Sequence, residues 1–158
     1  MLVPSLVSIR AAAAGLVLLL IGHAAPALAQ ARPGATPGEF DFWVLALTWS
    51  PSFCEATSER TSRSMQCAGE RPYHFVVHGL WPQYTRGFPE YCQVPAPDLD
   101  RGTVNAMLDI MPAPGLVRHQ WAKHGTCSGA RSARAYFEQV RQARAKVRIP
   151  AEFETPTE

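Results

Sequence analysis

The sequence predicts a mixed domain in which two β-strands come first and three α-helices follow. The chain has 158 residues, a length typical of one domain. Its early apolar runs are short and rich in aromatic and β-branched residues, as strands are. Residues 132–147 repeat apolar residues at helical spacing. Two strands make a marginal sheet, so we expect either another strand within the loops or a native chain that continues beyond Glu158.

The strands are expected over residues 42–49 and 73–80. The Ser-Pro pair at 50–51 would end the first strand, because proline lacks the N–H that a strand ladder needs. The stretches 55–71 and 87–97 lack the periodicity of a helix or strand and are expected to be loops.

The second strand carries His78, and Pro82 is expected to end it. Successive side chains of a strand point to opposite faces. We therefore expect His78 to share one face with Val76, and Phe75 to share the other with Val77.

Helices are expected over residues 103–111, 116–124 and 132–147. Thr103 and Ser132 are residue types that cap the start of a helix through their hydroxyl groups. The last helix has an apolar face and needs a surface on which to bury it.

Residues 1–29 are expected to be a secretory signal. Arg10 supplies the positive charge, residues 11–21 are apolar apart from Gly15, and Ala27-Leu-Ala29 is a cleavage site. The apolar run is shorter than the roughly 20 residues of a membrane span. Cleavage would give a secreted or periplasmic protein that is not held in a membrane; an uncleaved anchor is the alternative.

The mature chain would contain a linker over residues 30–39 and one domain over residues 40–158. Loss of Arg10 leaves fourteen basic and thirteen acidic side chains, a net charge of about +1. This charge excludes a broad electrostatic patch for nucleic acid, so a polyanion would have to be held by a few local cations.

Four cysteines follow the predicted signal. An even number of cysteines in an exported chain predicts two disulfides, and four cysteines allow three pairings. The sequence has no C-x-x-C pattern, which argues against a zinc ribbon or a thioredoxin-like redox site.

Two segments, residues 75–84 and 119–127, concentrate the polar chemistry, and each holds histidine close to tryptophan. At about 100° per residue, four side chains of the second segment share one arc of a helix. They are His119, Gln120, Lys123 and His124. Trp121 falls outside the arc. We expect the arc to face a cleft and Trp121 to pack in the interior; a solvated polar face is the alternative.

General acid–base catalysis suits these groups better than zinc binding, because the histidines are five residues apart rather than four and neither segment has a carboxylate. Histidine can both accept and donate a proton near neutral pH. RNA needs no metal, cofactor or enzyme nucleophile, because its own 2′-hydroxyl attacks the phosphorus. Trp81 and Tyr84 offer aromatic faces for bases, and Trp49 is expected to pack in the core.

The two segments resemble those of the ribonuclease T2 family, which are secreted, metal-independent endoribonucleases. His-Gly-Leu-Trp-Pro at 78–82 is similar to the first active-site segment of that family, and residues 119–127 are similar to the second. The stretch Leu47-Thr-Trp-Ser-Pro-Ser-Phe-Cys54 resembles its first core strand. The resemblance covers residues 40–150 and implies an α+β fold, an antiparallel sheet flanked by helices.

The resemblance implies a role for each site residue. His124 would be the base and His78 the acid in forming a 2′,3′-cyclic phosphate, which water then opens to a 3′-phosphate. Lys123 and His119 would stabilise the phosphate. Trp81 and Gln83 would line a base-binding site, to which the aromatic face of Tyr84 could add. The implied disulfides join Cys54 to Cys67 and Cys92 to Cys127. We expect a monomer that binds single-stranded RNA.

Three departures from the family pattern qualify these roles. Gln120 occupies the place of a catalytic glutamate, and an amide cannot exchange a proton. Gln83 stands where some members have an acidic base-reading residue, so base preference is unassigned. Family members also continue beyond residue 150, which suggests a C-terminally truncated domain. The alternatives are a catalytically impaired RNA-binding member of the same fold and a zinc hydrolase that uses His78, His119 and His124.

Overall fold

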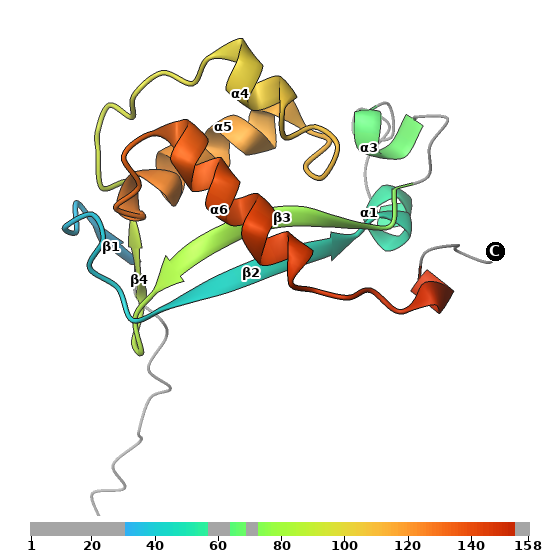
Figure 1. Ribbon diagram of the computed structural model, residues 1–158, viewed down its shortest axis with the longest axis horizontal. Helices are drawn as coiled ribbons and strands as arrows, with labels where there is room; N and C mark the ends of the chain where they lie inside the picture. Colours follow the sequence, from blue (N-terminus) through green and yellow to red (C-terminus); the bar gives the residue numbers. More distant parts are fainter. Residues whose placement is uncertain (1–30, 57–63, 69–72, 154–158) are drawn as a thin grey trace, which may run out of the picture.

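The computed structural model describes residues 31–56, 64–68 and 73–153. The predicted signal at 1–29 lies outside the described residues. A long antiparallel strand pair, β2 (Phe42–Trp49) and β3 (Phe75–Gln83), forms the base of the molecule (Figure 1). Helix α6 (Ala133–Ala145) crosses it, and helices α4 (Arg101–Asn105) and α5 (Pro114–Lys123) lie beyond β3. This is the α+β arrangement that the sequence led us to expect.

Strands β2 (Phe42–Trp49) and β3 (Phe75–Gln83) pair from Phe42 opposite Gln83 to Trp49 opposite Phe75. The first predicted strand is confirmed residue for residue. The second continues beyond its predicted end, through Pro82. Within the described residues β3 has a strand neighbour on one edge only, and a proline is tolerated in an edge strand.

A second, two-stranded sheet was not expected from the sequence. β1 (Ala31–Pro33) lies parallel to β4 (Phe88–Glu90), with Ala31 opposite Phe88 and Pro33 opposite Glu90. The prediction of a loop over 87–97 is therefore wrong at 88–90, and part of the expected linker is a strand. Strands of three residues are too short to show an alternating pattern.

Short helices occupy two stretches where none was expected. α1 (Ser50–Ala56) follows β2 directly, because proline ends a strand but is accepted in the first turn of a helix. α3 (Met65–Ala68) lies within the predicted loop. The disulfide Cys54–Cys67 joins the two helices, and the Gln66 side-chain amide donates a buried hydrogen bond of 3.0 Å to the Ser50 hydroxyl.

Helix α4 (Arg101–Asn105) is shorter than predicted and is capped by Asp100, not by Thr103. The Asp100 carboxylate accepts hydrogen bonds from the Thr103 backbone N–H, at 2.9 Å, and from its hydroxyl, at 2.6 Å. Asp and Thr are both residue types that cap helices, so the residue types alone do not decide which of the two begins the helix.

The two later helices agree with their predicted positions. α5 (Pro114–Lys123) begins two residues early because Pro114 occupies its first turn, where the missing N–H costs nothing. A 3₁₀ turn, Gly125–Cys127, follows it. α6 (Ala133–Ala145) is capped by Ser132, as predicted, and a last 3₁₀ turn spans Ala151–Phe153.

The core lies between β3 and the helices, which is the surface that the last helix required. Tyr136 of α6 is fully buried, and its hydroxyl donates a 2.8 Å hydrogen bond to the Leu80 carbonyl of β3. Burial raises the pKa of this phenol, so it stays neutral. The buried apolar side chains around it are Val77, Leu80, Val104, Met107, Met111, Val117, Trp121, Phe137 and Val140.

None of the helices in the described parts of the chain has both the length and the apolar character needed to cross a membrane.

Candidate active site

His78 lies at a β-bulge in the middle of β3. Ala46 of β2 pairs with Gly79 and the next residue, Leu47, pairs with Val77, so His78 is left without an opposite residue. The extra residue interrupts the alternation of faces. Val76 lies opposite Thr48 and outside the buried cluster that contains Val77, and His78 contacts the same Thr48. This agrees with the expected placement of His78 and Val76 on one face, although Val76 is buried and His78 is exposed. The bulge turns the imidazole away from the core.

The exposed imidazole of His78 has two neighbours on the strands. Its Nδ1 is 3.3 Å from the Thr48 hydroxyl on β2, and its ring meets the edge of Trp81 at a centroid distance of 5.9 Å. Partial burial, and then the charge of His119, lower the pKa of His78 from its usual 6.5.

His124, at the end of α5, is buried, with only 5% of its surface exposed. Its ring stacks on the Trp81 indole, with centroids 5.3 Å apart and planes inclined by 29°. Burial is the main reason that its pKa falls to about 3, and the charges of Lys123, His119 and His78 lower it further. His124 is therefore a neutral imidazole at any pH well above that value. Its Nδ1 is buried without a hydrogen-bond partner among the described residues.

Trp81 lies between the two histidines and is held by Gln120. The indole N–H donates a 2.8 Å hydrogen bond to the Gln120 Oε1. Gln120 is only 1% exposed and packs over Gly79. A Cβ at position 79 would overlap both the Gln120 oxygen and the Trp81 nitrogen, so this contact requires glycine.

The polar arc predicted for α5 is only partly correct. Trp121 is buried, as expected, and donates a 2.8 Å hydrogen bond to the Pro97 carbonyl. Among the arc residues, however, His119 is exposed, Lys123 is half-buried and Gln120 is enclosed. One side of the arc therefore faces the sheet, where Gln120 contacts Trp81, and the other side faces solvent.

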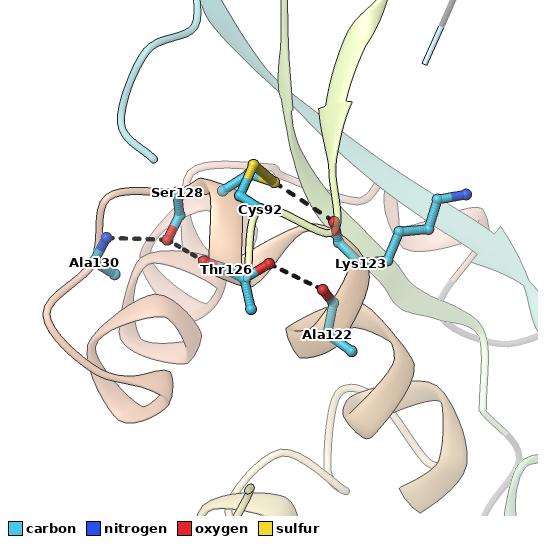
Figure 2. The surroundings of a disulfide bond; sticks show 8 residues. Cys92, Ala122, Lys123, Thr126, Ser128 and Ala130 are labelled. Atoms are coloured by element: carbon cyan, nitrogen blue, oxygen red, sulfur yellow. Dashed lines mark hydrogen bonds between the residues drawn. A yellow bond between two sulfur atoms is a disulfide. The ribbon is translucent and has the colours of Figure 1, made fainter. Parts of the chain in front are cut away.

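The disulfide Cys92–Cys127 fixes the C-terminal end of α5. Figure 2 shows the Lys123 side chain extending away from this bridge. The turn after the helix is held by the Thr126 hydroxyl, which donates to the Ala122 carbonyl at 2.9 Å. Both disulfides pair the cysteines as the resemblance implies.

The remaining residues of the predicted site lie near the end of β3 or at the far end of the sheet. Gln83 and Tyr84 come two and three residues after Trp81, and both are half-buried. Trp49 is at the opposite end, where its ring packs 4.8 Å from Phe75 and 5.8 Å from Phe153. It packs against aromatic neighbours there, as expected.

No group of three or more His, Cys, Asp or Glu side chains placed to hold a metal ion occurs among the described residues. The three histidines of the zinc alternative thus lack the arrangement of a metal centre. A hollow of about 1020 Å³ between α4, α6 and the 93–100 loop contains neither His78 nor His124. We place the site at His78 and His124 because these two histidines, both with lowered pKa values, converge on Trp81.

Comparison with known proteins decides the family. The model of the ribonuclease T2 family matches residues 40–155, which include both histidine segments and all four cysteines. This chain belongs to the ribonuclease T2 family.

Relatives within the T2 family are named as ribonucleases. A ribonuclease of Aeromonas hydrophila is 44% identical over 92 residues, which cover 58% of this chain and 40% of that protein. A probable ribonuclease of Haemophilus influenzae is 34% identical over 121 residues, covering 70% of this chain and 44% of the relative. The chain thus spans less than half the length of these two relatives.

Among solved structures, the T2 fold is shared with RNase NT, determined in complex with 5′-AMP. It is 30% identical, the TM-score is 0.56, and the match covers 68% of this chain and 57% of that one.

Several residues of this T2 site were missed in the sequence. Thr48 beside His78, and Phe88 and Glu90 beside Lys123, lie outside the two histidine segments. Glu90 and Phe88 belong to a three-residue strand without a pattern of its own. Gly79 lies inside the first segment, but its role depends on the packing of α5 against β3, which the sequence does not reveal.

Proposed function

We propose that this chain is an endoribonuclease that cleaves single-stranded RNA by transphosphorylation and then hydrolysis. The observation that carries the proposal is the Trp81 indole with a histidine on either side, one buried and one exposed. Two imidazoles in unequal environments are what an acid–base pair requires.

The pKa order supports a specific assignment. His124, whose pKa is about 3, is neutral and serves as the base. It takes the proton from the 2′-hydroxyl as that oxygen attacks the phosphorus. His78, whose pKa is lowered less, serves in its protonated form as the acid. It gives its proton to the departing 5′-oxygen, and the product is a 2′,3′-cyclic phosphate.

Hydrolysis of the cyclic phosphate reverses these roles. His78, now neutral, takes a proton from water, and His124, now protonated, returns its proton to the 2′-oxygen. The product is a 3′-phosphate, and both histidines regain their starting states. The substrate supplies the first nucleophile and water the second, so the cycle needs no cofactor.

Lys123 and His119 stabilise the phosphate in this proposal. The Lys123 ammonium lies close enough to His124 to lower its pKa, and His119 affects both histidines. Each can therefore act on a phosphate that lies between His78 and His124. Cations that face the charge developing on phosphorus lower the barrier.

We assign Trp81, Gln83 and Tyr84 to the base-binding side of the cleft. Trp81 also orients His124, since one interaction of its ring is the stack on that imidazole. Gln120 does not act on the phosphate in this proposal, because its side chain is enclosed, with only 1% of its surface exposed, and its carbonyl oxygen accepts the indole N–H.

A catalytically impaired RNA-binding protein is the second candidate, and Gln120 is the observation that motivates it. The enclosed Gln120 holds Trp81 and leaves His78 and His124, the two proton-transfer groups, in place. This favours catalysis over binding alone. We also propose export, removal of residues 1–29 and action as a monomer outside the cytoplasm. Two disulfides support an oxidising location.

The test is cleavage of a labelled single-stranded RNA by the oxidised protein in excess EDTA. We expect cleavage that chelation does not affect, and a loss of roughly 10²–10⁴-fold for His78→Ala and for His124→Ala. His74→Ala is the matched control, because this histidine packs near Trp49, away from Trp81. Binding without cleavage would favour the second candidate, and loss of cleavage on chelation would contradict the metal-free mechanism.

A further inference from the structure

We propose that Glu90 is a positioning residue that, together with Phe88, holds the Lys123 ammonium in place for the phosphate. This inference rests on the proposed function and assigns a part of the site outside both histidine segments. The Lys123 Nζ lies 3.4 Å from the Glu90 carboxylate and 5.8 Å from the centre of the Phe88 ring. The side chains of Lys123 and Glu90 are only 27% and 16% exposed.

The two neighbours of Lys123 come from one face of strand β4. Phe88 and Glu90 are two residues apart, so their side chains point the same way. A carboxylate and an aromatic face both attract an ammonium group. Together they define one location for a side chain that otherwise has a long, flexible stem.

The backbone after Glu90 is attached to the end of α5 at consecutive residues. The Tyr91 N–H donates a 2.9 Å hydrogen bond to the Lys123 carbonyl, and Cys92 is bridged to Cys127. Tyr91 has a φ of 48°, a conformation that is uncommon for residues other than glycine. This turn allows the Glu90 carboxylate and the Tyr91 amide to meet the same lysine. β1 supports the arrangement, with the Gly34 N–H donating to the Glu90 carbonyl at 3.3 Å.

An ammonium held in this way can still bind phosphate. Lysine has three N–H donors, and one contact with Glu90 leaves two for the substrate. A cation that is already in position costs no reorganisation during the reaction. The negative charge of Glu90, however, opposes the approach of RNA. Glu90 should therefore favour the chemical step at some expense in ground-state binding.

This balance distinguishes positioning from a purely structural ion pair. For Glu90→Gln we expect kcat to fall roughly 10- to 100-fold, because a displaced catalytic group has effects of this size. KM for a short RNA should stay unchanged or fall, because a negative charge has been removed. A structural tether would instead lower stability and leave kcat unchanged at temperatures where the protein is folded.

The decisive experiment is a double-mutant cycle in the full chain with Glu90→Gln and Lys123→Met. We expect Glu90→Gln to have no effect on kcat in the Lys123→Met background, because Glu90 acts through that lysine. Glu138→Gln, which removes an exposed carboxylate from α6, is the matched charge control and should leave kcat unchanged. Equal losses in both backgrounds, or an unchanged or raised kcat for Glu90→Gln alone, would overturn the proposal.

A second measurement does not depend on activity. The ¹⁵N signal of the Lys123 ammonium should report a restrained group in the wild-type protein and a mobile one in Glu90→Gln. The same mobility in both would overturn the positioning role even if RNA is cleaved. A wild-type protein that shows the restrained ammonium but cleaves no RNA would instead contradict the proposed function.

Discussion

Replacement of Gln120 by leucine tests whether this amide supports the site by holding Trp81. Leucine is similar in size, so the core around this 1% exposed position should remain filled. What is lost is the acceptor of the 2.8 Å bond from the Trp81 indole. The half-buried N–H then lacks its partner, which costs about 1–3 kcal/mol of unfolding free energy.

The same substitution should slow catalysis. Trp81 stacks on His124, so an indole released from Gln120 no longer fixes the base. We expect kcat on RNA to fall roughly 10- to 100-fold, the effect of a small misplacement of a catalytic group. Urea unfolding followed by circular dichroism, with the disulfides intact, gives the stability, and cleavage of a short RNA gives kcat. A Gln120→Leu protein as stable and as active as the wild type would refute the reasoning.

Gln120→Glu is the companion variant. A glutamate can keep the acceptor for Trp81, and its charge, where ionised, would stabilise the His124 imidazolium. The pKa of His124 should then rise from about 3, and the acidic limb of the rate profile should move up with it. An unchanged rate at the optimum would show that the amide suffices. A large increase would show that this chain has lost a catalytic group.

Three further predictions follow from the described contacts. As the pH increases, kcat/KM should rise near pH 3, where His124 loses its proton. It should fall again at a pH lower than 6.5, where His78 loses its proton, because both pKa values are lowered. An optimum above pH 7 would contradict this order. Gly79→Ala should break the Trp81–Gln120 bond and lower kcat as Gln120→Leu does, and a normal kcat would show that the packing tolerates a methyl group. Tyr136→Phe should cost about 1–2 kcal/mol in urea unfolding by removing the buried hydrogen bond to the Leu80 carbonyl, without changing kcat; an unchanged midpoint would contradict the role of that bond.

The sequence predicted elements whose local signals agree with their environment. β2 is a continuous run of aromatic and β-branched residues that pairs along its whole length. α6 has a serine cap and an apolar face, and the core accepts that face. The two histidine segments were also recognisable, because their spacing is local to each segment.

The features that depend on one residue or on contacts between elements could not be predicted. The bulge at His78 inserts a single residue into β3, and an alternating pattern of side chains gives no sign of such an insertion. The helical arc predicts that Gln120 lies beside His119. It does not predict that β3 covers Gln120 and leaves His119 exposed. Glu90 reaches Lys123 through a three-residue strand and a residue with positive φ, neither of which has a clear pattern in the sequence.

The central claim is that the histidines on either side of Trp81 move the protons of an attack by the 2′-hydroxyl. An oligonucleotide with a single ribonucleotide among deoxynucleotides tests it most directly, with the products identified by mass spectrometry in excess EDTA. The account predicts cleavage only on the 3′ side of the ribonucleotide, a 2′,3′-cyclic phosphate before the 3′-phosphate, and no cleavage of the all-deoxy control. Cleavage of that control, or products that carry a 5′-phosphate, would contradict it.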